Sequence, residues 1–364
     1  MNRAHQPGRS GSENGLYRVA IVGAGTLKGK ELAEVLPEST FPAVDIKLLD
    51  DDESLGQLES VGEEVTFVQS VRAENFEHVD FTFFASQPDF TRKHWRIAQQ
   101  AGSLIVDLSH ALEDTPGARV RSPWLERELR HSQIPELEPA PVVTAHPAAV
   151  VLALLIARAQ KVANLRSAVA TVFEPASEHG RAGMDELHEQ TVNLLSFQEM
   201  PKAVFDAQVA FNVLARYGEN SSPTLESAER RILSHYRQIT GQVPQPGSVP
   251  HADVPVPSLM LVQAPIFHGH VFSLYIELEQ AHSIGDFSQA IAGEHVELTR
   301  GSEESPSNVA AAGSEDMMVW IRADAQRETG FWIWAAADNL RVLALNAIDA
   351  AQQMAAAMPK GKLQ

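Results

Sequence analysis

The stretch Tyr17–Gly29 (YRVAIVGAGTLKG) decides the fold of this chain. Its first six residues are an apolar run typical of a buried strand, and Leu32, Val35 and Leu36 then recur at helical spacing. Glycines between a strand and a helix let the backbone approach a pyrophosphate, and the helix N-terminus supplies amide donors and the positive end of a dipole. The stretch therefore predicts a dinucleotide-binding unit, with a strand–helix turn that holds no ligand as the alternative.

Strand-like and helix-like segments alternate after this loop as far as residue 147. Further strands are predicted at Ile46–Leu49, Phe81–Ala85, Leu104–Leu108 and Val142–Ala145, with a helix at Thr91–Ala101. Such alternation is typical of a parallel sheet with helices on both faces. We therefore predict the α/β class, with a Rossmann-type NAD-binding domain over residues 16–147 that follows a disordered tail over residues 1–15.

The pattern changes from about residue 148. A helix to Ala157, a strand at Ala168–Phe173 and a helix-rich stretch at Gly183–Thr240 precede a proline-rich loop over 242–257 and a long strand around Val271–Glu279. We interpret residues 148–335 as an α+β dimerisation and substrate domain. Residues 336–364 are predicted to form a C-terminal helix, centred on Leu340–Met354, that packs back on the first domain.

The second predicted strand ends in four consecutive carboxylates, Asp50 to Glu53. An acid at this place normally accepts hydrogen bonds from the adenine ribose of NAD, and clustered carboxylates repel the 2′-phosphate of NADP. We therefore predict NAD rather than NADP, if a nucleotide binds. A solvated acidic turn is the alternative.

Composition excludes several classes of function. The 364 residues contain no cysteine, which rules out disulfides, thiolate metal sites and a thiol nucleophile. The 29 basic and 47 acidic side chains give a net charge of −18, which argues against nucleic acid and anionic membranes as partners. No apolar run reaches the ~18 residues that a membrane helix needs. We expect a soluble, cytoplasmic protein.

Seven stretches, in order from residue 17 to about 354, resemble the aspartate-semialdehyde dehydrogenase family of amino-acid biosynthesis. The loop Gly23–Gly29 is similar to its G-A-[TS]-G-x-x-G pattern, and Val143–Ala149 (VTAHPAA) is similar to its I-A-N-P-x-C segment. Residues 171–191 (TVFEPASEHGRAGMDELHEQT) resemble its T-Y-Q-x-x-S-G-x-G…EL-x-x-QT pattern. The other four stretches are Ala210–Leu214, Glu229–Ile239, Gly269-His270 and Asp338-Asn339-Leu340.

The resemblance implies a reaction whose main groups are absent here. In that family a cysteine thiolate attacks an aldehyde, hydride leaves to NADP, and phosphate cleaves the thioester. The position of that cysteine is Ala149, while Gln263 and Glu113 stand for two anion-binding arginines. Glu174 replaces a glutamine and Ala228 a substrate-binding glutamate. The acid/base His270 is kept, and Arg231 stands for a lysine. This pattern resembles the Usg-like branch, which lacks the catalytic cysteine.

The complete set of expected site residues follows from the loop, the acidic turn and the resemblance. The catalytic positions are His270, Ala149, Glu174 and Gln263, and the substrate pocket contains Glu113 and Arg231. The cofactor-binding positions are Gly23, Gly25, Thr26, Leu27, Gly29, Asp50, Ser54 and Asn339. No metal is expected, because the pair His268 and His270 lacks matching carboxylate spacing. A retained acid/base histidine, or one simply held in the fold, is the preferred interpretation of His270.

Three hypotheses about function follow. The first is a catalytically degenerate family member, a pseudoenzyme that forms a homodimer, binds NAD, and acts by binding or regulation, including association with the active family enzyme. The second is an NAD-dependent oxidoreductase that transfers hydride directly to or from an aldehyde or oxo group, with His270 or Glu174 as the acid/base. The third is a purely structural interaction protein that binds no nucleotide.

Overall fold

The computed structural model describes residues 15–51, 56–62, 64–129, 140–243, 254–299 and 304–357. The predicted tail, the acidic residues Asp52 and Glu53, the cofactor candidate Ser54 and most of the proline-rich loop lie outside the described residues. The chain divides into two compact units. The first unit comprises Met1–Arg119, Pro135–Thr144 and Ala347–Gln364, and the second comprises Val120–Ile134 and Ala145–Asn346. Among the described residues, no helix has the length and apolar character needed to cross a membrane.

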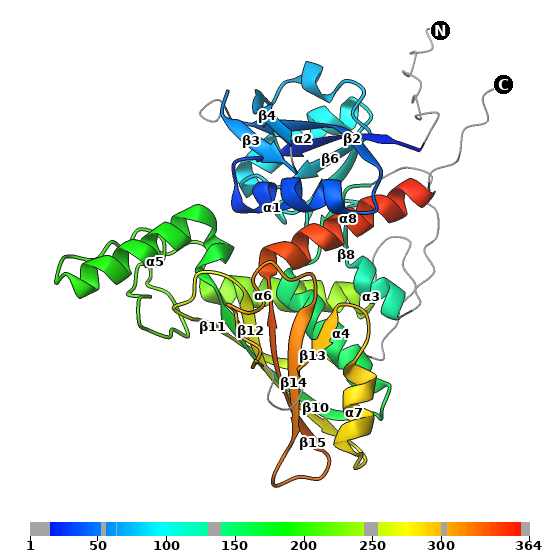
Figure 1. Cartoon of the computed structure of the whole chain (residues 1–364), viewed down its shortest axis with the longest axis vertical. Helices are drawn as coiled ribbons and strands as arrows, with labels where there is room; N and C mark the ends of the chain where they lie inside the picture. Colours follow the sequence, from blue (N-terminus) through cyan, green and yellow to red (C-terminus); the bar gives the residue numbers. More distant parts are fainter. Residues whose placement is uncertain are drawn as a thin grey trace. The chain divides into compact units, whose positions relative to one another are not determined.

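The first unit is built on a seven-stranded sheet with the order β5-β2-β1-β6-β7-β9-β8 (Figure 1). The neighbours from β5 to β9 pair in parallel, and the α/β class is confirmed. Its elements are β1 (Tyr17–Val22), α1 (Leu27–Val35), η1 (Leu36–Glu38), β2 (Ala43–Asp50), β3 (Leu58–Val61), β4 (Glu64–Phe67), β5 (Gln69–Ser70), η2 (Ala73–Phe76), β6 (Phe81–Phe84), α2 (Pro88–Gln100), β7 (Leu104–Asp107), β8 (Arg119–Arg121), whose residues from Val120 belong to the second unit, and β9 (Val142–Thr144).

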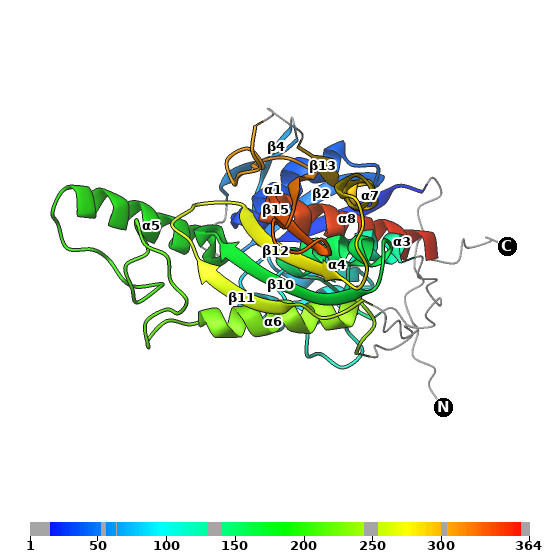
Figure 2. The same ribbon diagram turned by 90° about the horizontal axis from the view of Figure 1, so that it is seen from below.

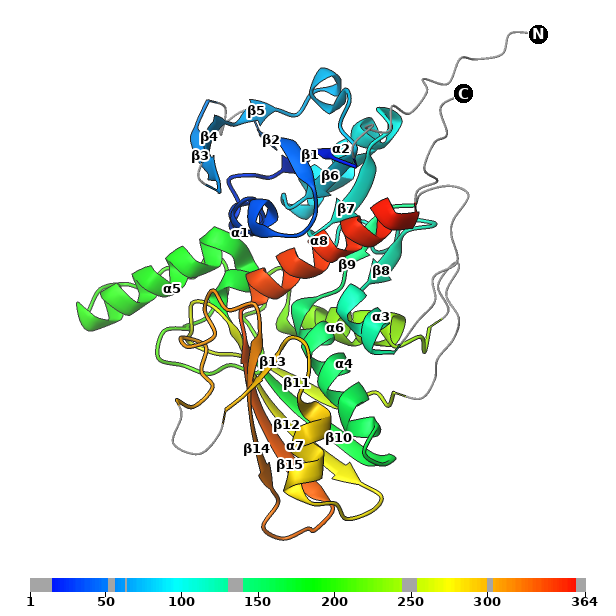
Figure 3. The same cartoon turned by 45° about the vertical axis from the view of Figure 1, so that its right-hand side comes forward.

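An antiparallel hairpin, β3–β4, was not predicted from the sequence and lies beside α1 in the first unit (Figure 3). Lys30 of α1 forms an ion pair with Glu59 of β3 at 2.9 Å between Nζ and Oε1. Leu58, Val65 and Phe67 of the hairpin are exposed, so the hairpin lacks the buried apolar residues that mark a strand in a sequence.

The second unit contains a six-stranded mixed sheet with the order β11-β10-β12-β15-β14-β13. Its elements are α3 (Pro123–Glu128), α4 (Pro147–Gln160), β10 (Leu165–Glu174), η3 (Ala176–His179), α5 (Gly180–Leu195), α6 (Leu225–Ile239), β11 (Ser258–Gln263), β12 (His270–Leu278), α7 (Ile284–Ile291), β13 (Val296–Leu298), β14 (Met317–Ala323), β15 (Gly330–Ala337) and α8 (Asn339–Ala357), whose last residues from Ala347 onward belong to the first unit. Helices α4, α6 and α7 pack against this sheet, and α6 runs along β10 and β11 in Figure 2.

The side chains of this sheet alternate between two environments. Ala168, Ala170 and Val172 of β10 are buried, whereas Val169 between them is 47% exposed. Successive side chains of a strand point to opposite faces of the sheet. The helices therefore cover one face, and side chains on the other face are exposed to solvent in a single chain. Helix α4 is apolar nearly all round, and its residues from Pro147 to Ala159 are all buried, as expected for a helix at the centre of a unit.

The prediction of a helix-rich stretch over Gly183–Thr240 is wrong in its middle. Helix α5 ends at Leu195, α6 begins at Leu225, and the segment between them has no helix. Gln190 of α5 holds this segment through its side chain, which accepts from the backbone amide of Val209 at 2.7 Å and donates to the carbonyl of Pro201 at 2.8 Å. The hydrogen bonds that hold the segment thus come from a side chain 11 and 19 positions away, and the local pattern of apolar residues gives no sign of them.

Candidate functional site

The sheet of the second unit brings four predicted site residues to one region. Glu174 ends β10 and Gln263 ends β11, and the two are direct partners in the parallel register. His270 begins β12, which pairs antiparallel with β10, so it lies at the same edge of the sheet. It is also the register partner of Ala337 at the end of β15, two residues before Asn339. The topology therefore assembles Glu174, Gln263, His270 and Asn339.

His270 is buried and has unused hydrogen-bonding capacity. Its side chain is 1% exposed, and neither ring nitrogen has a hydrogen-bond partner among the described residues. Its Nε2 lies 3.8 Å from Oε1 of Glu178. Burial lowers the pKa of His270, and the nearby Glu178 carboxylate opposes that shift. The ring is therefore neutral near pH 7, with one nitrogen able to donate and the other able to accept.

Glu178 is the residue of this site that sequence analysis missed. It lies in η3, its side chain is 13% exposed, and its Oε1 accepts a hydrogen bond from Nδ2 of Asn339 at 2.7 Å. Its Oε2 is 3.6 Å from Nε2 of His146. The sequence does contain a signal for it: when Glu174 is placed on the glutamine of the quoted family pattern, Glu178 stands where that pattern has glycine.

His146 is the N-cap residue of α4, and its ring centroid lies 5.7 Å from that of His270. Its Nδ1 accepts the backbone amide of Ala148 at 3.2 Å, which places the proton of the neutral ring on Nε2, toward Glu178. Burial is the main cause that lowers the pKa of His146 to about 3. Ala149, in the first turn of α4, is fully buried, and its methyl side chain supplies no nucleophile.

Gln263 and Glu174 form a second buried group with Tyr217. The Gln263 Nε2 donates to the carbonyls of Glu174 at 3.0 Å and Ala264 at 2.8 Å, and its Oε1 accepts from the Tyr217 hydroxyl at 2.7 Å. Burial raises the pKa of Glu174 well above its ordinary value, and Glu174 Oε2 has no hydrogen-bond partner among the described residues. His179 also reaches the Tyr217 hydroxyl, with 2.9 Å to its Nε2. The Gln263 amide is thus fully engaged, whereas Glu174 is a buried acid with a raised pKa and one oxygen without a partner among the described residues.

His268 does not form a metal pair with His270. Its Nδ1 lies 3.2 Å from Oγ of Ser177 and its Nε2 3.1 Å from Asp338, so both nitrogens are engaged within the unit. The Asn339 Nδ2 also lies 3.2 Å from Ser177 Oγ, which links the two groups. No cluster with metal-ligating composition occurs among the residues that the structure describes. Arg231 is half-buried on α6 and near enough to His146 to lower its pKa.

The glycine loop lies in the first unit. Gly23 has φ +87°, and a Cβ there would be 2.4 Å from the backbone of Ser86; a Cβ on Gly29 would be 2.1 Å from the Gly23 carbonyl. Both positions therefore require glycine. Thr26 caps α1, which begins at Leu27, by accepting the Gly29 amide at 3.0 Å. These contacts fit the tight strand–turn–helix junction that a pyrophosphate-binding loop needs.

Asp50 closes this loop rather than pointing into solvent. It is buried, and its Oδ2 accepts the exposed Gly25 amide at 2.7 Å, while Oδ1 accepts the Asp51 amide. Burial is the main cause that raises the Asp50 pKa, and the Glu59 carboxylate adds to it. Each carboxylate oxygen keeps a second lone pair for a ribose hydroxyl, so the residues present fit a dinucleotide. Glu113 lies in the same unit, half-buried.

Comparisons with known proteins agree with this geometry. The family profile for a semialdehyde dehydrogenase NAD binding domain matches residues 18–154, and the profile for a semialdehyde dehydrogenase dimerisation domain matches residues 155–342. The USG-1 protein homolog of Azotobacter vinelandii is 31% identical over 340 residues, which cover 92% of this chain and 96% of that protein. The aspartate-semialdehyde dehydrogenase of Rickettsia bellii is 27% identical over 346 residues, covering 93% and 97%.

Solved structures resemble the whole chain. The structure of a probable aspartate-semialdehyde dehydrogenase from Pseudomonas aeruginosa has a TM-score of 0.79 and 27% identity, covering 93% of this chain and 98% of that one. Aspartate-semialdehyde dehydrogenase II from Vibrio cholerae shares the fold, with a TM-score of 0.78 at 22% identity over 93% and 98% of the two chains.

Proposed function

The chain belongs to the semialdehyde dehydrogenase family, and on that premise we propose that it is a catalytically degenerate member. In this proposal it keeps the nucleotide-binding and dimerisation fold and has lost the phosphorylating dehydrogenase reaction. A USG-1 protein homolog among its relatives supports placement in the Usg-like branch. The role left to such a protein is binding or regulation, in the cytoplasm, alone or with the active family enzyme.

One observation carries the proposal. The site retains its histidine, but the side chain at the nucleophile position is the buried methyl group of Ala149, in a chain without cysteine. Removing a catalytic nucleophile typically lowers the rate by about a million-fold. Gln263 offers no substitute for an anion-binding arginine, because its amide group is held by Tyr217 and two backbone carbonyls.

The first unit is an NAD(P)-binding domain, and we propose that it prefers NAD. Burial raises the pKa of Asp50, at the end of β2, and the carboxylates of Asp51 and Glu59 are close enough for their negative charges to raise it further. Lys30 balances part of this charge through its ion pair with Glu59. A 2′-phosphate at the end of β2 would meet this negative potential, whereas a ribose hydroxyl would donate to it.

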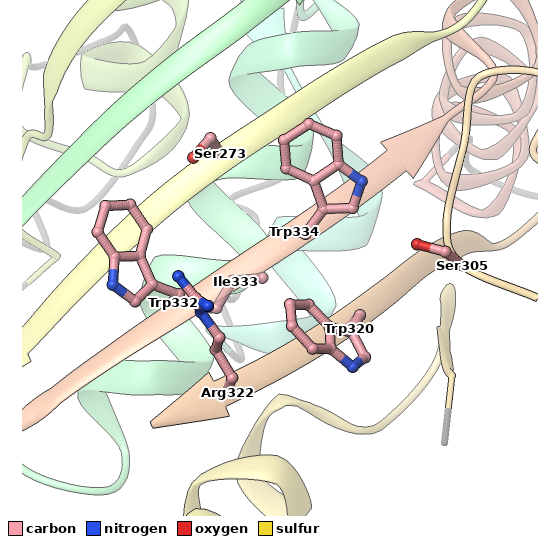
Figure 4. A pocket seen from close by; sticks show the side chains of 7 residues that line it. All are labelled: Ser273, Ser305, Trp320, Arg322, Trp332, Ile333 and Trp334. Carbon is pink, nitrogen blue, oxygen red and sulfur yellow. The ribbon is translucent and has the colours of Figure 1, made fainter. Parts of the chain in front are cut away.

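We propose a homodimer that forms through the open face of the sheet in the second unit. A pocket of about 320 Å³ on β12, β14 and β15 is lined by Trp320, Trp332 and Trp334 beside Arg322 (Figure 4). Trp320 is 39% exposed and Val169 on the same sheet is 47% exposed. Aromatic residues and arginine are enriched in protein interfaces, and this face lies within the matched dimerisation domain.

A second candidate is direct hydride transfer between NAD(H) and an aldehyde or oxo group. The observation that favours it is Glu174, a buried acid whose pKa is raised by burial and whose Oε2 has no hydrogen-bond partner among the described residues, at the same end of the sheet as His270. Either group could exchange a proton with a carbonyl oxygen, and neither step requires a thiol. Hydride and a proton would convert an aldehyde to an alcohol and an imine to an amine, so the screen with NADH should include neutral and cationic aldehydes and imines.

The test is a paired titration with NAD and NADP, followed by the family assay on the same preparation. The proposal expects tighter binding of NAD and no phosphate-dependent reduction of either cofactor with aspartate semialdehyde. Measurable turnover in that assay would contradict the degenerate assignment, and oxidation of NADH by an aldehyde from the screen would favour the second candidate. An unchanged melting temperature at millimolar NAD would instead support the purely structural hypothesis, because a ligand of the native state raises stability by mass action.

A further inference from the structure

A pocket of about 310 Å³ lies in the first unit, between the glycine loop, α1 and the β3–β4 hairpin, which stands beside α1 in Figure 3. Most of the residues that line it have small side chains or none: Ala24, Ala33, Ser60 and Gly62. The others are charged: Lys30, Glu34 and Glu59. The pocket therefore has room for a small polar group, and the charges of its wall determine which group can bind there.

The pocket reaches the place where a dinucleotide would hold its adenine ribose. Ala24, which lines it, precedes Gly25, and the Gly25 amide donates to Asp50 at the end of β2. An acid at this place in a dinucleotide-binding domain accepts hydrogen bonds from the ribose hydroxyls. Burial raises the pKa of Asp50, and the charge of Glu59 adds to that shift. A group attached to the ribose near Asp50 would therefore also be subject to the charge of Glu59.

Lys30 is the cation of this pocket, and Glu59 holds it. Its Nζ lies 2.9 Å from Oε1 of Glu59. The Glu59 side chain is 19% exposed and that of Lys30 is 51% exposed, so the carboxylate is held against the protein while the ammonium group is free to turn toward a ligand once the carboxylate is gone.

The charges of the wall are unfavourable for a phosphate as long as this ion pair is present. Among the described residues that line the pocket, two carboxylates, of Glu34 and Glu59, accompany one ammonium group. A phosphate monoester has a charge of about −1.5 to −2 near pH 7. It would compete with Glu59 for Lys30 and would be repelled by both carboxylates.

We propose that Glu59 is a specificity-determining residue of the dinucleotide site, which by pairing with Lys30 keeps the 2′-phosphate of NADP out of the pocket beside the glycine loop. The inference rests on the proposed preference for NAD and deepens it, because it assigns that preference to an ion pair as well as to the acid at the end of β2. Since the small lining residues leave space, charge rather than size excludes the phosphate. Removal of the Glu59 charge should therefore make Lys30 a phosphate ligand.

The experiment measures the binding of four probes to the full-length protein by isothermal titration calorimetry at constant ionic strength. The probes are NAD, NADP, 5′-AMP and adenosine 2′,5′-bisphosphate, so each pair differs only in the 2′-phosphate. Glu59→Gln keeps the size of the side chain. It is expected to bind both 2′-phosphorylated probes about ten-fold more tightly than the unchanged protein does, or better, as one charge-assisted hydrogen bond would give. The affinities for NAD and 5′-AMP should stay the same.

Two further variants separate the ion pair from a general effect of charge. Adding Lys30→Gln to Glu59→Gln removes the released cation and should abolish the gain for the 2′-phosphorylated probes. Glu74→Gln is the control, because Glu74 is an exposed carboxylate of the same unit that does not line the pocket; all four affinities should be unchanged. Exposed ion pairs contribute little to stability, so these variants should fold. Glu59→Ser, with the same expectations, replaces Glu59→Gln if that variant does not fold.

The outcomes distinguish this proposal from the preference for NAD. Unchanged NADP affinity in Glu59→Gln, or a gain that persists when Lys30→Gln is added, would overturn the role of Glu59 and leave the preference in place. Equal affinities for NAD and NADP in the unchanged protein would contradict the preference and the role of Glu59 together. If none of the four probes binds, the pocket is not part of a nucleotide site, and the proposal is overturned.

Discussion

Replacing Ala149 by cysteine returns a thiol to the position that the family resemblance assigns to the nucleophile, and we expect it to restore no useful activity. The site differs from an active one in more than this side chain. Gln263 is held by three hydrogen bonds, and Glu113 has a negative charge where the family has an arginine. A new thiolate would therefore lack both groups that hold the anionic substrate and the phosphate.

The expected deficit can be estimated from these two positions. A hydrogen bond to a charged group contributes about 1.5–3 kcal/mol, so two missing arginines cost roughly 3–6 kcal/mol of transition-state stabilisation. At about 1.4 kcal/mol per factor of ten, this corresponds to a loss of roughly 10²- to 10⁴-fold. The added sulfur also enters a fully buried position, where overpacking costs about 1–3 kcal/mol of stability. The variant should turn over at less than about 1% of the rate of an active relative.

The assay is phosphate-dependent reduction of NAD and NADP with aspartate semialdehyde. Because the chain has no other cysteine, titration with a chromogenic disulfide reports only the new thiol and shows whether it is reachable. Ala148→Cys, in the same helical turn and equally buried, is the matched control for the effect of a thiol as such. Turnover within ten-fold of an active relative, at Ala149→Cys and not at Ala148→Cys, would refute the reasoning and show that the anion-binding groups are intact.

Three further expectations concern the two units and the open sheet face. Gly23→Ala should lower the melting temperature and abolish any increase of it by NAD, because the new Cβ would lie 2.4 Å from the Ser86 backbone at a φ of +87°. A melting temperature equal to that of the unchanged protein would contradict this close approach. The pKa of His146 is about 3 in the folded protein, below the ordinary value of 6.5. As the pH falls, the unfolded chain therefore binds the proton at a higher pH than the folded protein does. The free energy of unfolding should decrease between pH 6.5 and pH 3, by up to about 1.4 kcal/mol per pH unit. Urea unfolding across that range measures the slope, which His146→Asn should flatten. Trp320→Glu should convert the proposed homodimer to monomer in sedimentation velocity, and an unchanged mass would contradict an interface on this face of the sheet.

The parts of the fold that were predictable share one property: their apolar residues lie in one short segment. Tyr17–Val22 has the predicted bounds. The predicted central strands and helices of the first unit are present, and α4 and α8 extend the predicted helices by a few residues. In each case the buried side chains recur at the spacing of a helix or a strand, so the apolar pattern of the segment is enough to predict the element.

The segments that were not predictable depend on contacts with distant residues. The hairpin β3–β4 is mostly exposed, and the loop after α5 is ordered by Gln190. At the site, the resemblance indicated His270 and Ala149, whereas the one signal for Glu178, a carboxylate where the family pattern has glycine, gave no information about its neighbours. Glu178 lies 32 positions after His146 and 92 positions before His270 in the sequence, and only the fold brings the three side chains together.

Most of the substitutions at the site remove positive charge or add a carboxylate, which bears on the ligand that the pocket can bind. Loss of the thiol alone would leave a pocket that still binds anions. Glu174 and Glu178 instead add acids beside His270, and Gln263 removes a positive charge. Ala228 is the exception, since it removes a carboxylate from α6, but Glu178 returns one near the histidine. A site with Gln263 in place of an arginine and with the added carboxylate of Glu178 is less suited to a phosphate than the family pattern, which supports the proposal that the phosphorylating reaction has been lost.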